Sequence, residues 1–323
     1  MSILVLTEEG DVHADYVIKA IEQRGGKCIR FHTETLVENI EYIFSMSKDR
    51  SLIGFIIKDS GLEFQIEDIK SVYYRRPKRP VAPLNVGDLG IKEFIQTESE
   101  ATLDGFFYSL AHVNTWMNHP IKNRVAGNKI GQLCKATQIG LNIPDTIITN
   151  NVDKAYQFFR ECNSDIICKS IRQELSLLNG QSVFVFTHTI PKEAERESFE
   201  GVRFGSSILQ RRIHKKSDVR VTLIGHSFFS VEIENDEVDW RKKDPYLLPH
   251  RIIDLPDYLK RHLLELQSSY GLFSSQIDLL ITHDGEFVFL EMNPNAQWLW
   301  VELITGLPIA DAIASILLGN TTE

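Results

Sequence analysis

The chain has 323 residues, and at roughly 100–200 residues per domain this length predicts two or three domains, each with a core of its own. Hydrophobic residues make up 43% of the chain and charged residues 24%, a composition that excludes intrinsic disorder. The 44 Asp and Glu residues outnumber the 35 Lys and Arg residues, so the net charge is −9. Proteins that hold nucleic acid by bulk electrostatics carry a basic face, and we therefore expect no nucleic-acid partner.

The cysteines and the N-terminus indicate the compartment. The 4 cysteines form no CxxC pair and no cluster with histidine, which favours reduced thiols over disulfides or a zinc site. The apolar run at the N-terminus lacks the basic flank and the length of a signal peptide. No stretch approaches the ~20 apolar residues that span a bilayer. We expect a soluble cytoplasmic protein without a membrane partner.

In the first third of the chain, short apolar runs alternate with a helical pattern. A helix is predicted over 12–24 and ends at the Gly25-Gly26 pair. Strands are predicted over 2–6, 27–32, 51–58 and 69–74, and a long helix over 92–117 closes the unit. Strands that alternate with helices predict a parallel α/β layer. We place the end of this N-terminal domain at residue 120, where Pro120 interrupts the helical pattern.

The middle of the chain, residues 121–206, predicts a small α+β domain. Its first helix, over 128–139, has apolar residues at helical spacing and Gly140 as a C-terminal cap. A second helix is predicted over 153–162, and strands are predicted over 145–149, 165–169 and 182–187.

The last third, residues 207–323, is dominated by antiparallel strands. Strands are predicted over 207–213, 218–224, 227–233, 276–282 and 287–292, with helices over 256–270 and 308–318. A turn at Gly225-His226 joins two of the strands. The fold class is therefore mixed, with an α/β domain, a central α+β domain and a C-terminal domain built on an antiparallel sheet.

The Asp284-Gly285 dipeptide between two β-rich runs is a strong hairpin signal. If this pair forms a two-residue turn, counting outward places Asp278 directly opposite Glu291. Asn293 follows two residues after Glu291 and shares its face of the sheet.

Two carboxylates that face each other across a sheet repel, and a cation between them removes the repulsion. The carboxylates of Asp278 and Glu291 with the carboxamide oxygen of Asn293 form a hard-oxygen set suited to Mg²⁺ or Mn²⁺. The alternative is a pair of solvated acids on the polar face of an edge hairpin. Apolar residues flank both acids, and this context favours the metal site.

A metal that is shared with phosphate requires cations nearby. Lys129 lies at the start of its predicted helix, and Lys169 ends an apolar strand, so both are candidate phosphate ligands. Arg220 lies within an apolar strand, and Arg241 follows Trp240, on which it could stack. The alternatives are strand-end lysines whose charged heads reach solvent, and an ordinary loop arginine.

The order of these residues resembles that of the ATP-grasp carboxylate ligases, in particular their RimK-like branch. The segments YYRRP (73–77), NKIGQLCKATQIGLNIPDTIITN (128–150) and EMNPNAQWLW (291–300) resemble those of the microviridin-type peptide ligases, which make graspetides. The resemblance extends over essentially the whole chain. It implies an ATP-grasp fold with a pre-ATP-grasp domain (1–120), a central subdomain (121–206) and a C-terminal subdomain (207–323) that carries the metal.

The resemblance also implies roles for individual residues. Lys129 and Lys169 would contact the α- and β-phosphates of ATP, and Asp278, Glu291 and Asn293 would hold Mg²⁺, with Mn²⁺ as a substitute. Arg220 would lie near the γ-phosphate or acyl-phosphate, and Arg241 would steady that intermediate. The remaining nucleotide contacts would come from the hinge residues Gln210, Arg211, Arg212 and Ile213, from Asp218 near the ribose, and from Asn295 at the border of the site. The chain departs from the family pattern at its flap, because residues 170–182 contain only Gly180.

The resemblance implies an ATP-dependent ligase with a precursor peptide as its partner. It would activate Asp or Glu side chains of the peptide as acyl-phosphates and crosslink them to Ser/Thr hydroxyls or Lys amines. Basic runs at 75–79, 211–216 and 241–243 could steer such an acidic peptide, or could be solvated surface. A RimK-like ligase that adds amino acids to a small molecule or protein tail, and a nucleotide-binding regulator without turnover, stay open as alternatives. A homodimer is also compatible with the sequence.

Overall fold

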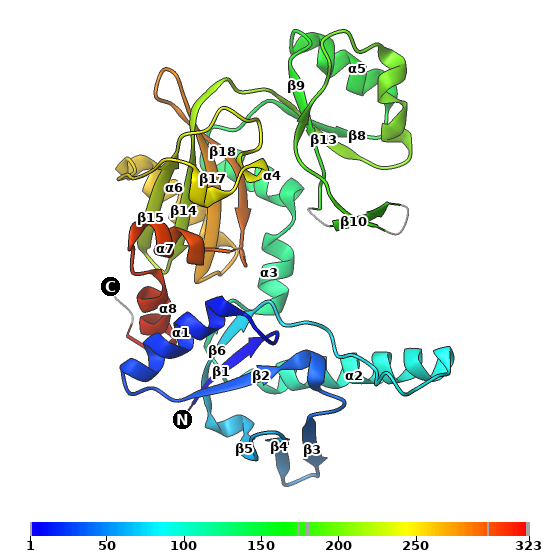
Figure 1. Ribbon diagram of the computed structural model, residues 1–323, viewed down its shortest axis with the longest axis vertical. Helices are drawn as coiled ribbons and strands as arrows, with labels where there is room; N and C mark the ends of the chain where they lie inside the picture. The colour runs from blue at the N-terminus through cyan, green and yellow to red at the C-terminus, as the bar shows by residue number, and fades with distance from the viewer. Residues whose placement is uncertain (1, 173–174, 179–180, 296, 321–323) are drawn as a thin grey trace.

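The computed structural model describes residues 2–172, 175–178, 181–295 and 297–320 (Figure 1). The mixed α/β and antiparallel architecture that the sequence predicts is confirmed. A parallel sheet and a smaller antiparallel sheet lie in the N-terminal part, another sheet forms the central part, and an antiparallel sheet dominates the C-terminal part (Figure 1). Short 3-10 helices connect the elements at Thr33–Thr35, Ile66–Asp68, Arg196–Arg203, Trp240–Lys242 and Pro245–Leu247.

The N-terminal sheet is parallel and four-stranded, with the order β2-β1-β6-β7. Its strands are β1 (Ser2–Thr7), β2 (Cys28–His32), β6 (Ile69–Arg75) and β7 (Thr115–Met117). Helix α1 (Val12–Gln23) follows β1 and begins at Asp11, whose carboxylate accepts hydrogen bonds from the first backbone N–H groups of the helix.

Three predictions for this part of the chain are wrong. The segment 51–58 forms a strand, β4 (Ser51–Ile57), but in an antiparallel sheet with β3 (Ile40–Met46) and β5 (Leu62–Gln65). Helix α2 (Leu89–Ser109) ends eight residues before 117, because residues 115–117 pair with β6 instead. Pro120 begins a helix, α3 (Pro120–Ala126), since proline at the first helical position gives up an N–H that would be unsatisfied there.

The central sheet is four-stranded, with the order β12-β9-β13-β8. Its strands are β8 (Thr146–Thr149), β9 (Ile166–Lys169), β12 (His188–Thr189) and β13 (Ser207–Arg211), and helix α5 (Val152–Glu161) covers it. A separate hairpin joins β10 (Leu175–Leu178) to β11 (Gln181–Phe184), at the position expected for the flap. Gly180, the single glycine in the segment 170–182, lies outside the described residues.

The pairing of β13 corrects the predicted boundary at residue 206. This strand was assigned to the C-terminal domain, but it pairs with β8 and β9 in the central sheet. Its C-terminal end is held by the backbone bonds from Arg211 N–H to Asp145 O and from Arg212 N–H to Asp165 O. The chain therefore leaves the central sheet only after residue 212.

The C-terminal sheet is antiparallel and five-stranded, with the order β16-β15-β14-β17-β18. Its strands are β14 (Lys215–Ile224), β15 (Ser227–Ile233), β16 (His250–Ile252), β17 (Ser274–Thr282) and β18 (Phe287–Asn293). Ile224 pairs with Ser227, which confirms the predicted turn at Gly225-His226. Helices α4 (Lys129–Ile139) and α6 (Asp257–Ser269) share one apolar core with this sheet.

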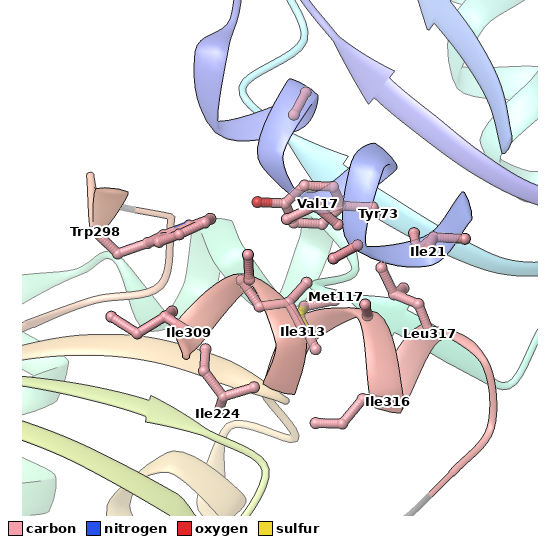
Figure 2. Close-up of a cluster of buried hydrophobic side chains, with 14 of the residues drawn as sticks. Val17, Ile21, Tyr73, Met117, Ile224, Trp298, Ile309, Ile313, Ile316 and Leu317 are labelled. Atoms are coloured by element: carbon pink, nitrogen blue, oxygen red, sulfur yellow. The ribbon is translucent and has the colours of Figure 1, made fainter. Parts of the chain in front are cut away.

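The chain ends against the domain in which it begins. Helix α7 (Leu299–Thr305) leads into α8 (Ile309–Leu317), and α8 lies beside α1 (Figure 1). Figure 2 shows Ile313 of α8 between Val17 of α1 and Ile224 of the C-terminal sheet, within a shared buried cluster. The two outer domains are thus joined by an apolar core. Within the described ranges, no helix has both the length and the apolar character to cross a membrane.

Candidate active site

The hairpin of β17 and β18 places two acidic residues face to face. Asp278 lies directly opposite Glu291, and the predicted pairing is therefore confirmed. The turn differs from the predicted one, because Thr282 N–H bonds to Glu286 O and the loop is one residue longer. A bulge in β18 at Leu290 shifts the register back by one residue. The longer loop and the bulge shift the pairing register in opposite directions, so Asp278 still lies opposite Glu291.

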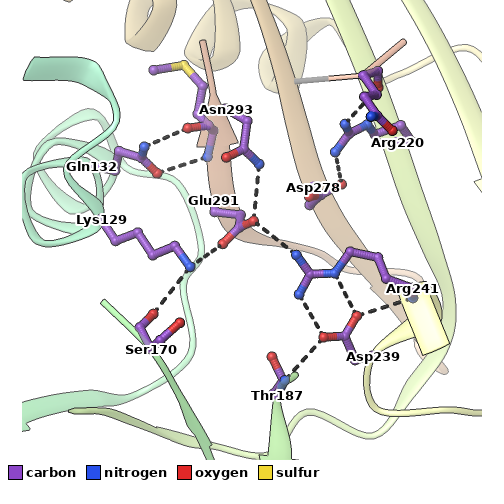
Figure 3. Close-up of polar contacts among 12 residues, drawn as sticks. Lys129, Gln132, Ser170, Thr187, Arg220, Asp239, Arg241, Asp278, Glu291 and Asn293 are labelled. Carbon is purple, nitrogen blue, oxygen red and sulfur yellow. Dashed lines mark hydrogen bonds and ion pairs between the residues drawn. The ribbon is translucent and has the colours of Figure 1, made fainter. Parts of the chain in front are cut away.

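Glu291 is buried and surrounded by cations (Figure 3). Its Oε2 atom lies 3.0 Å from the Nζ atom of Lys129, and its Oε1 atom accepts a 3.1 Å hydrogen bond from Asn293 Nδ2. The Nη1 atom of Arg241 is 4.0 Å from the same Oε1. Burial alone would raise the pKa of Glu291, but Lys129, Lys169 and Arg241 hold that pKa well below its ordinary value. Glu291 is therefore ionised at neutral pH.

Asp278 faces a different cation. Arg220 is its neighbour on β14, and its Nη1 atom lies 2.7 Å from Asp278 Oδ1. Burial raises the pKa of Asp278, Arg220 opposes that rise, and Glu291 adds to it. The exposed fraction is 9% for Asp278 and 7% for Glu291, and these values exclude the alternative of two solvated acids on an edge hairpin. Arg220 also donates to the carbonyl of Gln297 at 3.2 Å.

The two lysines reach the site from different elements. Lys129 begins helix α4 after the capping residue Asn128, and its Nζ atom also donates to Ser170 O at 3.3 Å. Lys169 ends strand β9, and only 9% of its surface is exposed. Burial lowers the pKa of Lys169 to about 8, partly offset by Glu291, while Lys129 and Arg241 lower it further. Because neither lysine reaches bulk solvent, the interpretation as solvent-seeking strand-end lysines is wrong.

Arg241 is held by a carboxylate that the sequence analysis missed. Asp239 accepts from Arg241 Nε at 2.8 Å and from Nη2 at 2.7 Å, and it also accepts the backbone N–H of Thr187 at 3.2 Å (Figure 3). The guanidinium is therefore aimed by a bidentate pair and is not that of an ordinary loop arginine. The ring of Trp240 lies 5.4 Å from that of Trp300. An acid two residues before the arginine was the available signal for Asp239.

One cavity of about 190 Å³ lies beside these groups. Its lining includes the predicted hinge residues, Asp218, both carboxylates and two of the cations. These residues are Lys169, Gln210, Arg211, Arg212, Ile213, Asp218, Arg241, Asp278 and Glu291. Burial raises the pKa of Asp218 to about 6, against the opposing effect of its ion pair with Lys215. Gln210 donates to Thr146 Oγ1 at 2.8 Å, and its own Oε1 is buried without a hydrogen-bond partner in the described part of the chain. Such an acceptor suits a ligand that brings a donor.

The donor set fits a hard divalent cation. Asp278 and Glu291 supply carboxylate oxygens from one face, and the amide oxygen of Asn293 is the atom that can serve as a ligand, since its amide nitrogen is turned to Glu291. The described residues include no cluster of three or more His, Cys, Asp or Glu side chains that could hold a metal. Such a site would therefore need water or phosphate oxygens to complete its coordination.

Asn295 lies elsewhere than predicted, and the contact of Gln132 was not predicted. Asn295 is outside the lining of the cavity, and its Oδ1 accepts from Arg75 Nη1 at 3.2 Å, at the contact between the N-terminal and C-terminal parts. Gln132 of α4, which the sequence analysis did not single out, bonds to the backbone of Met292 between the two ligands of β18 (Figure 3). Its signal was its position one turn after Lys129 in a helix with an otherwise apolar buried face.

The basic runs are largely neutralised by acids. In the run 75–79, Arg75 pairs with the buried Asp11 and Lys78 pairs with Glu8. In the run 241–243, Arg241 pairs with Asp239, and Lys243 pairs with a further aspartate. These ion pairs offset part of the positive charge of the two runs, while the side chains of Lys78 and Arg79 stay largely exposed.

Comparison with known proteins agrees with this geometry. Residues 2–124 match the model of the MvdD pre-ATP-grasp domain. The macrocyclase MdnC from Microcystis aeruginosa MRC, solved with its precursor peptide MdnA, is 28% identical with a TM-score of 0.87, over 99% of this chain and 100% of that one. The chain is thus similar to ATP-grasp peptide macrocyclases. This confirms the family resemblance and the expectation of an ATP-grasp enzyme.

Two further structures share the ATP-grasp fold. A RiPP-associated ATP-grasp ligase from Chryseobacterium gregarium, in complex with ADP and a leader and core peptide, is 24% identical with a TM-score of 0.91, over 100% of this chain and 98% of that one. The ATP-grasp ligase PsnB, complexed with a phosphomimetic variant of its minimal precursor, Mg and ADP, is 20% identical with a TM-score of 0.77, over 100% and 99%. No curated protein sequence matches the chain.

Proposed function

We propose that the protein uses ATP to crosslink side chains of a ribosomally made precursor peptide. It activates an Asp or Glu carboxylate of the peptide as an acyl-phosphate and then forms an ω-ester with a Ser or Thr hydroxyl, or an ω-amide with a Lys amine. The observation that carries this proposal is the meeting of Asp278, Glu291, Lys169 and Arg241 in one cavity with the hinge over 210–213. The peptide-bound macrocyclase that shares the fold supports the choice of substrate.

The hinge and the lysines bind the nucleotide. The backbone N–H groups of Arg211 and Arg212 already bond to carbonyls of the central sheet, at 2.9 and 3.0 Å. The N–H of Ile213 is therefore the hinge donor for adenine, and Asp218 lies where the ribose binds. Lys129 and Lys169 contact the α- and β-phosphates.

Asp278, Glu291 and Asn293 hold Mg²⁺ together with phosphate oxygens, and Mn²⁺ can take its place. The metal neutralises charge on the transferred phosphoryl group and helps to align it. Lys129 and Arg241 balance the charge of Glu291, and both would be available to phosphate oxygens if Glu291 held the metal. The charges needed for phosphoryl transfer are thus already in the site before ATP arrives.

Arg220 and Arg241 act on the transferred group. In the first step a carboxylate oxygen of the peptide attacks the γ-phosphorus and ADP leaves. In the second step the hydroxyl or amine attacks the acyl carbon, phosphate leaves, and the nucleophile loses its proton. Arg220 neutralises the phosphoryl oxygens, and Arg241, aimed by Asp239, stabilises the acyl-phosphate.

Mass spectrometry tests the proposal. Incubation with ATP, Mg²⁺ and a precursor peptide rich in Ser, Thr, Asp and Glu should remove one water from the peptide for every crosslink. A gain of amino-acid mass would instead support the RimK-like alternative. No ADP under any condition would support the regulator. We place the reaction in the cytoplasm, where ATP is present. Light scattering distinguishes a monomer from the homodimer that is compatible with the sequence.

A further inference from the structure

The side-chain amide of Gln132 makes hydrogen bonds to the backbone of β18 like those that a neighbouring strand would make. Strand β18 is the edge strand of the C-terminal sheet, and α4 runs along that edge. The Nε2 atom of Gln132 donates to Met292 O at 2.6 Å, and its Oε1 atom accepts from Met292 N–H at 2.9 Å (Figure 3). A third bond, from Nε2 to Ala126 O at 2.6 Å, fixes the amide to the end of α3. Gln132 is 2% exposed, so these bonds are shielded from water.

These contacts lie at the point where the register matters. The bulge at Leu290 separates two parts of the hairpin, because Leu279 pairs with Phe289 but Asp278 pairs with Glu291. If the register next to the turn continued without the bulge, Asp278 would face Leu290, and Glu291 would move out of phase with it. The bonds to Met292 hold the strand on the far side of the bulge.

The backbone of β18 is held on both sides of this bulge. On the turn side, Phe289 N–H donates to Asn142 O at 2.7 Å. On the other side, Gln132 takes both backbone groups of Met292, the residue between Glu291 and Asn293. Successive side chains of a strand alternate between faces, so fixing Met292 in the core fixes its two neighbours on the opposite face.

We propose that Gln132 is a positioning residue that holds β18 in its bulged register, so that Glu291 lies opposite Asp278, with Asn293 on the same face of the sheet, as a preformed Mg²⁺ site. This inference rests on the proposed function only for the identity of the metal. Outer-shell partners of this kind typically change metal affinity about 10–100-fold when they are removed.

The test compares two buried glutamines. Gln267 of α6 is also 2% exposed and also bonds to the C-terminal sheet, through Gly225 O and Ser275 Oγ, but it makes these bonds to β17 and to the turn after β14 and none of them to β18. We expect Gln132→Met to raise the Mg²⁺ concentration needed for half-maximal tightening of fluorescent ADP binding by about tenfold. Gln267→Met should lower the melting temperature similarly and leave that Mg²⁺ concentration unchanged. Gln132→Asn, with the same amide one methylene shorter, should shift it in the same direction by less.

Hydrogen exchange supplies a readout that needs no metal. Amides of the segment 289–293 should exchange faster in Gln132→Met and Gln132→Asn than in Gln267→Met. Equal Mg²⁺ dependence and equal exchange in the Gln132 and Gln267 variants would overturn the inference while leaving the proposed function intact. If ADP binding to the unaltered protein did not respond to Mg²⁺ or Mn²⁺, the metal assignment itself would be wrong, and the inference would fall with it.

Discussion

The aromatic core of the N-terminal domain and the charged centre between the other two sheets are buried to similar degrees but are stabilised differently. In the N-terminal domain, the ring of Phe106 lies 4.3 Å from that of Phe55 and 5.5 Å from that of Phe31. In the charged centre, Glu291 is surrounded by Lys129, Lys169 and Arg241. The first region gains free energy from burial of apolar surface, while the second keeps every buried charge near an opposite one.

The two regions differ in whether a bound ligand can replace the contacts within the protein. Interlocked rings have no partner to release, so any change of volume costs stability. The buried charges form pairs within the protein, and phosphate and metal can replace those partners without leaving a charge uncompensated. Binding chemistry is therefore located in the region where the contacts are ionic and replaceable.

The largest effect in the charged centre should come from removing the charge of Glu291. We expect Glu291→Gln to lower crosslinking turnover at least about 10³-fold, because the metal loses a ligand and the phosphoryl group loses its alignment. In contrast, metal-free ADP should bind more tightly, since Lys129 and Lys169 no longer have that carboxylate as a partner. Turnover by mass spectrometry and a nucleotide titration measure the two effects. Glu286→Gln, on the exposed turn of the same hairpin, is the control. Weaker binding of metal-free ADP to the Glu291→Gln variant would contradict the interpretation that phosphate replaces Glu291 as the partner of the lysines.

The matching change in the aromatic core should affect stability instead. Phe106→Ala should lower the free energy of unfolding by about 3–5 kcal/mol, because it removes a buried ring and leaves a cavity. Turnover per folded molecule should stay close to normal at low temperature. Phe94, on the same helix but 66% exposed against 1% for Phe106, gives the control Phe94→Ala with little effect. Denaturant unfolding measures both variants, and equal losses would show that the ring cluster is not the stabilising feature.

A smaller effect should come from the pair of Arg220 and Asp278, which are bonded at 2.7 Å. Arg220→Gln and Asp278→Asn should each destabilise the protein, because each leaves a buried charge without its partner. The double variant should lose less than the sum of the two, with a coupling free energy of about 1–3 kcal/mol. A double-mutant cycle by chemical denaturation gives this value. Strict additivity would mean that the pair does not interact in the folded protein.

The mildest effect should be a pH dependence from Lys169. Burial lowers the pKa of this lysine to about 8, so above that pH the nucleotide-free protein must take up a proton before the ammonium can bind phosphate. Affinity for ADP should therefore be flat below about pH 8 and then fall about tenfold per pH unit. Lys169→Arg should remove this slope because arginine stays charged. The same slope in Lys169→Arg would assign the titration to another group.

The sequence predicted the hairpin pairing for a reason that was only partly right. The Asp284-Gly285 signal located the turn, and alternation put Asp278 and Glu291 on one face. The actual loop is one residue longer, and the bulge at Leu290 compensates for the extra residue. Bulges depend on what lies against the strand edge, here Asn142 and Gln132, and no local pattern in β18 reports those contacts.

Elements whose ends depend on distant pairing were predicted less well. The helical pattern of α2 continues toward residue 117, but the segment 115–117 gains more by adding a parallel strand beside β6. Strand β13 was recognised as a strand, yet its assignment to the central sheet depends on β8 and β9, which precede it by tens of residues. Local propensity is a weak prior wherever such a partner competes.

The order of residue types along the chain was enough to predict the fold class, to single out two acids and two lysines (Asp278, Glu291, Lys129 and Lys169), and to place both carboxylates on one face of the sheet. Alternation and turn chemistry act over a few residues, and a local pattern therefore reports them. The tertiary structure alone decided which groups meet: Asp239 behind Arg241, Gln132 against Met292, and Asn295 with Arg75 away from the cavity. These contacts join elements that are far apart in the chain. They form only when apolar burial brings the sheets and helices together, and a local pattern contains no information about that approach.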